Sequence, residues 1–169
     1  MQILEVDTID GIEKALHQLL VDCVNSGASV GFITPIDDLE IQAYWQAVNK
    51  QLLQKQRKLF IAVNRDEVLG AVQLSLCSKA NGSHRGEVEK LMVTTKARGQ
   101  GISKKLMHLM EKSAQSLGLT LLVLDTRLGD IASTLYRKLD YIEAGQIPQF
   151  ARSSNGDLDA TVYFYKLLK

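Results

Sequence analysis

Residues 87–117 read EVEKLMVTTKARGQGISKKLMHLMEKSAQSL, and the rest of the chain is arranged around this segment. Its first seven residues are rich in strand-forming side chains, and two glycines follow a short connector. After Gly101 apolar side chains recur at steps of three and four residues, which is typical of a helix with one buried face. The members of this stripe are Ile102, Leu106, Leu109, Met110, Ala114 and Leu117. The segment therefore predicts a strand, a glycine-bearing turn and an amphipathic helix.

The turn between strand and helix has the properties of an anion site. The first backbone N–H groups of a helix have no intrahelical partner and carry partial positive charge, so a phosphate can bind there. Gly99 and Gly101 have no Cβ that would keep an anion at a distance. Arg98 and Lys104 add full positive charges on either side. This pattern predicts a cradle for a pyrophosphate.

Two other glycine loops bind phosphates, and neither spacing is present. A Walker loop needs Gly-x-x-x-x-Gly-Lys-Ser/Thr, and a dinucleotide fingerprint needs Gly-x-Gly-x-x-Gly. The spacing alone leaves one further interpretation open, which is an ordinary tight turn before a core helix.

A resemblance to a known family favours the pyrophosphate interpretation. Arg98–Ser103 resembles the Arg/Gln-x-x-Gly-x-Gly/Ala loop of the GNAT superfamily of acetyl-CoA-dependent N-acetyltransferases. Downstream, residues 132–141 (ASTLYRKLDY) are similar to the family's Ala-x-x-Leu-Tyr-x-x-Leu-Gly-Phe segment. The resemblance extends from about Gly27 to the C-terminus. The chain departs from the family pattern at Ser103, Gly129 and Asp140.

The resemblance implies an α/β fold of the GNAT kind, with a mixed, mostly antiparallel sheet of about seven strands flanked by helices. A length of 169 residues, with 46% hydrophobic and 23% charged residues, fits a single domain over residues 1–169. The patterns predict strands at 3–6, 58–63, 68–77, 87–93, 120–124, 141–144 and 160–168, and helices at 10–24, from 34 onward, 101–117 and 131–138.

Three local features accompany these elements. Thr34-Pro35 reads as the start of a helix, with threonine as the N-cap. The apolar residues of 87–93 break the alternation of a regular strand, which predicts a β-bulge. Residues 145–159 read as a long loop that borders the acceptor pocket.

The resemblance also assigns roles to individual residues. The backbone of Leu91, Met92 and Val93 would bind the pantetheine arm and the thioester carbonyl of acetyl-CoA. The pyrophosphate would bind the loop, whose residues are Arg98, Gly99, Gln100, Gly101, Ile102 and Ser103.

Transfer of an acetyl group to an amine also needs a proton acceptor and a proton donor. Tyr136 falls on the family's Leu-Tyr position, and a phenol with a pKa near ~10 is suited to protonating a thiolate. Glu87 and Asp125 are the candidate bases for the amine proton. At the level of sequence they can also be read as ordinary strand or cap residues, and Tyr136 as a packed core residue.

Other partners and sites are disfavoured. A formal charge of +1 gives no electrostatic case for nucleic acid or an acidic membrane surface, and no apolar run approaches the ~20 residues that cross a bilayer. The three histidines are scattered and the two cysteines lack metal-type spacing, so we expect no metal. Two widely spaced cysteines without a recognisable signal peptide indicate a cytoplasmic protein with free thiols. Whether the chain forms a homodimer is left open.

Three functions follow from these observations. The first is acetylation of the primary amine of a small molecule. The resemblance suggests an amino-acid-like β-lactam toxin or antibiotic as one acceptor, which would give the enzyme a role in resistance. The second is acetylation of protein lysines or N-termini. The third is a non-catalytic sensor that binds acetyl-CoA.

Overall fold

The computed structural model describes residues 1–169, and all of its strands belong to one mixed sheet of seven strands. The strand order is β1-β2-β3-β4-β5-β7-β6, and every neighbouring pair is antiparallel except β4 and β5. The expected sheet is therefore confirmed. The strands are β1 (Gln2–Val6), β2 (Arg57–Asn64), β3 (Glu67–Leu76), β4 (Arg85–Val93), β5 (Leu121–Arg127), β6 (Ile142–Arg152) and β7 (Leu158–Leu167).

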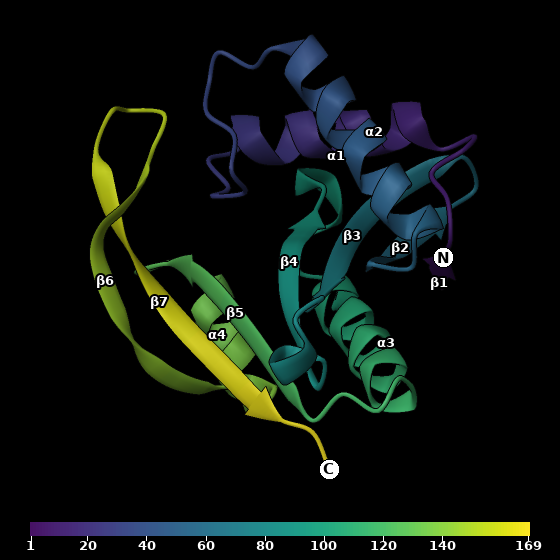
Figure 1. The fold of residues 1–169 in the computed structure, drawn as a ribbon. Helices are drawn as coiled ribbons and strands as arrows, with labels where there is room; N and C mark the ends of the chain where they lie inside the picture. The colour runs from purple at the N-terminus through teal and green to yellow at the C-terminus, as the bar shows by residue number, and fades with distance from the viewer.

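Helices cover both faces of the sheet (Figure 1). They are α1 (Glu13–Asn25), α2 (Asp38–Leu53), α3 (Ile102–Ser116) and α4 (Ala132–Lys138), with single 3-10 turns at Ala80–Gly82 and Thr95–Ala97. The helices α1 and α2 pack on one face around the fully buried side chains of Leu16, Leu20 and Ile41. The helices α3 and α4 pack on the other face, where Leu106 and Met110 join Phe60 and Phe164 in a second core.

The strand β4 contains the predicted bulge. On β3 Ala71 and Gln73 are two positions apart, whereas their partners Met92 and Glu89 on β4 are three positions apart. The additional residue lies at Lys90 or Leu91, and the left-handed φ of 53° at Lys90 marks the distortion. A bulge leaves backbone groups of the strand outside the regular hydrogen-bond ladder.

The only parallel pair of the sheet is short. The strands β4 and β5 are in register only from Arg85 to Glu87 and from Leu121 to Val123, near the beginning of each strand. Beyond these residues the two strands diverge, as Figure 1 shows for β4 and β5. The carboxyl ends of two parallel strands are thereby separated, and such a gap is a common place for a ligand in α/β proteins.

Two local predictions were wrong. The helix α2 begins at Asp38 rather than near Thr34, because the side chain of Asp37 caps it by accepting a hydrogen bond from Leu39 N at 2.8 Å. The expected loop 145–159 is mostly a hairpin, since β6 continues to Arg152 and β7 begins at Leu158. The strand β6 lies at the edge of the sheet and is exposed along nearly its whole length. Because neither of its faces is buried, its sequence does not alternate between apolar and polar residues.

No helix of the chain is both long enough and apolar enough to cross a membrane. The structure also contains no group of three or more His, Cys, Asp or Glu side chains placed to hold a metal ion. Cys23 and Cys77 are both free thiols.

Candidate active site

A cavity of about 930 Å³ fills the gap between β4 and β5. Its walls come from the distal half of β4, the end of β5, the beginning of α3, the helix α4 and the connection after α1. This is within the size range of small-molecule and cofactor sites.

The predicted anion loop forms one end of this cavity. Gly99 and Gly101 adopt left-handed φ values of 75° and 73°, which an L-residue with a Cβ disfavours. The first hydrogen bond of α3 is donated by Lys105 N to Gly101 O at 3.2 Å, so the amides of Ile102, Ser103 and Lys104 have no partner within the helix. No side chain caps this helix end. The loop therefore presents a row of free donors at the positive end of a helix dipole.

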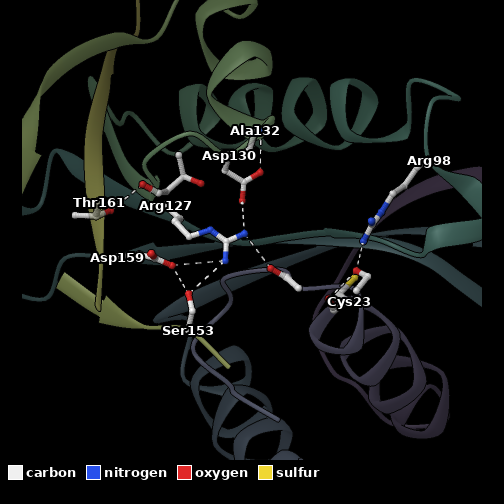
Figure 2. Close-up of polar contacts among 11 residues, drawn as sticks. Cys23, Arg98, Arg127, Asp130, Ala132, Ser153, Asp159 and Thr161 are labelled. Atoms are coloured by element: carbon white, nitrogen blue, oxygen red, sulfur yellow. Dashed lines mark hydrogen bonds and ion pairs between the residues drawn. The ribbon is translucent and has the colours of Figure 1, made fainter. Parts of the chain in front are cut away.

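The guanidinium of Arg98 is hydrogen-bonded within the chain. It donates from Nε to Val93 O at 3.2 Å and from NH2 to Ser26 Oγ at 2.6 Å. Figure 2 shows the side chain directed toward the end of α1, next to Cys23, which itself donates to Val93 O at 3.5 Å. Arg98 thus links the loop to β4 and to the end of α1 by hydrogen bonds. Lys104, which is exposed, is a cation beside the loop that has no ion pair.

Tyr136 lies in the cavity wall on α4 and is only 6% exposed. Its ring packs 5.8 Å from that of Tyr141 and 5.9 Å from that of Phe164 between centroids. Burial, followed by the negative charges of Asp130 and Asp125, raises the pKa of Tyr136 well above its ordinary value. The hydroxyl therefore stays protonated at neutral pH and is available as a proton donor.

The two candidate bases differ in position. Asp125 lines the cavity, and its Oδ2 accepts a hydrogen bond of 2.7 Å from Thr161 Oγ1. Glu87 does not belong to the cavity wall, since it lies in the paired section of β4 and is exposed. Although Glu87 is exposed, the protein around it partly desolvates its carboxylate, and this effect, followed by the charges of Glu89 and Asp125, raises its pKa.

Sequence reasoning did not single out Glu89 as a site residue, yet it lies in the cavity wall. Its Oε2 accepts from Arg57 NH1 at 2.9 Å, and the same nitrogen donates to Gln73 Oε1 at 2.7 Å. The amide of the fully buried Gln73 in turn donates to Tyr44 Oη at 2.8 Å. This network crosses β2, β3, β4 and α2, so no local sequence signal could have revealed it.

Arg127 was also missed, and it joins four segments around the cavity (Figure 2). Its NH2 donates to Gly27 O at 3.0 Å and lies 3.8 Å from Asp130 Oδ2. Its NH1 lies 3.5 Å from Ser153 Oγ and 4.0 Å from Asp159 Oδ2. Arg127 thereby links β5 to the connection after α1, to the residues before α4 and to the hairpin of β6 and β7.

The structure brings most of the predicted site residues together in the cavity wall. Those present are Leu91, Met92, Val93, Arg98, Gly99, Gly101, Ile102, Ser103, Asp125 and Tyr136. Glu87 and Gln100 are the two that lie outside it. Asp140, where the family usually has glycine, adopts a left-handed φ of 64°, which explains why glycine suits that position.

Residues 15–141 match the sequence profile of the acetyltransferase (GNAT) family, which is most of the 169-residue chain. The chain belongs to the GNAT acetyltransferase family. It is accordingly an acetyltransferase that uses acetyl-CoA, and the free amides of the glycine loop fit the pyrophosphate of that co-substrate.

Solved structures of GNAT proteins share the fold. A ribosomal-protein-alanine N-acetyltransferase from Brucella melitensis superposes with a TM-score of 0.83 at 20% identity, over 99% of this chain and 100% of that one. A phosphinothricin acetyltransferase from Sinorhizobium meliloti in complex with AcCoA gives 0.80 at 18% identity, over 99% and 89%. The putative acetyltransferase yncA from Salmonella typhimurium, with its cofactor acetyl-CoA, gives 0.77 at 18% identity, over 100% and 95%.

Proposed function

We propose that this GNAT enzyme acetylates the primary amine of a small molecule. The observation that carries the proposal is the wall that bounds the cavity on the side away from the glycine loop. There Arg127 bonds Gly27 O, while Thr34 N donates to Ser154 Oγ at 3.0 Å, so the hairpin of β6 and β7 is tied to the connection after α1. A wall of this kind encloses a small acceptor, whereas a protein lysine or N-terminus needs an open groove.

Each step of the transfer has a candidate residue in the chain. Acetyl-CoA supplies an activated acyl group as a thioester. The amides of Gly99 to Ser103 would hold its pyrophosphate, and the backbone from Leu91 to Val93 would bind the arm and polarise the carbonyl. Asp125 would collect the proton of the acceptor amine, with Glu87 as the alternative base. Tyr136 Oη would donate a proton to the departing sulfur.

An amino-acid-like β-lactam is the acceptor that we propose within this class. Several segments, among them Gln73–Cys77, Lys90–Val93 and Leu124–Thr126, resemble the tabtoxin resistance protein, a GNAT enzyme. Detoxification of such a compound would be cytoplasmic, and the two free thiols support that location.

Thiol release from acetyl-CoA, measured with a panel of amines, tests the proposal. The panel contains amino acids, β-lactam amino acids, polyamines, and peptides with free N-termini or lysines. We expect turnover with small amines and at least tenfold lower kcat/KM with the peptides. Faster turnover of peptides would assign the enzyme to protein acetylation, and tight CoA binding without turnover of any amine would indicate a sensor.

A further inference from the structure

Lys90 occupies an unusual position in the cavity wall. It lies in the bulge of β4 with a left-handed φ of 53°, and it is half-buried. A methyl group built on Gly31 would lie 3.1 Å from Lys90 Nζ, so the ammonium is directly against the connection between α1 and α2. The same nitrogen lies 5.6 Å from the ring centroid of Tyr44. The bulge therefore places a lysine amine on the acceptor side of the cavity.

The charge of Lys90 has no partner within the chain. None of the nine ion pairs includes it, and its amine makes no hydrogen bond to another residue. The neighbouring Glu89 is engaged by Arg57. Tyr44 supplies only a ring face, since burial raises its pKa to about 12 and keeps the phenol neutral.

The other cations of the cavity wall are either bonded or exposed. Arg127 contacts two carboxylates and donates to a backbone carbonyl. Arg98 donates to a backbone carbonyl and to a serine hydroxyl. Lys104 and Lys138 are solvent-exposed. Lys90 is the one partly buried cation of the wall without a bonded partner, and a charge removed from water without a partner is costly. Consistent with this, burial lowers the pKa of Lys90, while Glu89 and Asp125 act against that shift from a distance.

We propose that Lys90 binds the carboxylate of the acceptor, and that the acceptor is therefore an amine that also carries a carboxylate. This inference rests on the proposed small-molecule acetyltransferase function. Lys90 and Asp125 line the same cavity, one cationic and one anionic. The pair matches the two charges of an amino-acid-like molecule, with the carboxylate at Lys90 and the ammonium at Asp125. An acceptor carboxylate would supply the counter-charge that the chain does not.

The test compares acids with their amides. Each acceptor of the panel is paired with the compound in which the carboxylate is replaced by a neutral carboxamide of the same shape. For the wild-type enzyme we expect kcat/KM to be roughly 10- to 100-fold higher for the acid, as expected for a hydrogen bond between charged groups. Lys90→Met should abolish this preference by lowering the value for acids alone. Lys90→Arg should restore part of it.

Matched variants separate the local charge from general effects. Lys138→Met removes an exposed positive charge from the same cavity wall and should leave the preference unchanged. Lys90→Gly suits the left-handed backbone and should behave as Lys90→Met, so strain or misfolding of one variant does not decide the result. An equal acid preference in wild-type and both truncated variants would overturn the proposal. The proposal would also be overturned if mass spectrometry showed that Lys90 itself becomes acetylated during turnover.

A binding measurement distinguishes failure of this inference from failure of the proposed function. Calorimetry with CoA-saturated protein compares an N-acetylated amino acid with its amide and needs no turnover. Tighter binding of the acid that is lost in Lys90→Met supports the carboxylate site even if no amine of the panel is acetylated. Equal binding of both compounds to wild-type and variant refutes the site, even if amines are acetylated rapidly.

Discussion

Replacing Tyr136 with phenylalanine removes one hydroxyl from the cavity and leaves the aromatic ring in place. The ring contacts with Tyr141 and Phe164 persist, and the hydroxyl has no hydrogen-bonded partner in the chain. The free energy of unfolding should therefore change by less than about 1 kcal/mol. The effect on catalysis should be much larger, because a positioned proton donor contributes roughly 10²–10⁴-fold. This range corresponds to about 3–5 kcal/mol of activation free energy.

The assay is steady-state release of CoA thiol, combined with a thermal unfolding curve. Tyr141→Phe is the matched control, because it also removes the hydroxyl of a buried tyrosine, and Tyr141 does not line the cavity. Burial raises the pKa of Tyr136, so its protonated form, which is the donor, persists through the alkaline range to beyond pH ~10. Wild-type activity should then show no loss from Tyr136 ionisation below that pH. Activity of Tyr136→Phe within threefold of wild type would refute the role as proton donor.

Four further substitutions test other parts of the site. Gly101→Val forces a β-branched residue into a left-handed φ of 73°, so we expect the free energy of unfolding to fall by about 1–2 kcal/mol. Calorimetry should show at least tenfold weaker CoA binding, and an unchanged affinity would contradict the role of the loop in binding CoA. Arg127→Met removes the link to Gly27 and should raise the acceptor KM roughly tenfold while kcat changes less, and an unaffected KM would exclude that role. Asp125→Asn should lower kcat/KM roughly 10²-fold and Glu87→Gln less than tenfold. A carboxylate at position 87 would lose its function as a base when the pH falls through the raised pKa of Glu87. If the fall in activity at acidic pH disappears in Glu87→Gln, the base is Glu87.

The parts of the fold that the sequence predicted are those determined by local interactions. The glycine turn and α3 were visible because the left-handed residues Gly99 and Gly101 and the helical stripe after them are contiguous in sequence. The bulge at Lys90 was visible because it breaks the alternation within one strand. The start of α2 was misplaced because Thr34 and Asp37 are both acceptable caps, and only the folded chain shows that Asp37 is used.

The remaining features depend on contacts between distant residues. The sequence predicts a loop where β6 and β7 form a hairpin, because an exposed edge strand needs no apolar alternation. The link from Arg127 to Gly27 spans 100 positions of sequence, and the link from Arg57 to Glu89 spans 32. Neither residue type nor spacing distinguishes these arginines from surface arginines, so their roles became apparent only from the arrangement of the cavity.

We propose that backbone amides at the start of α3 bind the pyrophosphate of acetyl-CoA. Titration of ¹⁵N-labelled protein with CoA, followed by amide NMR spectra, tests it most directly. We predict that the amide signals of Gly99, Gly101, Ile102 and Ser103 move downfield as the protein saturates, because each N–H gains a charged acceptor. If these signals stay in place in a protein saturated with CoA, the pyrophosphate binds elsewhere and the account of the site is wrong.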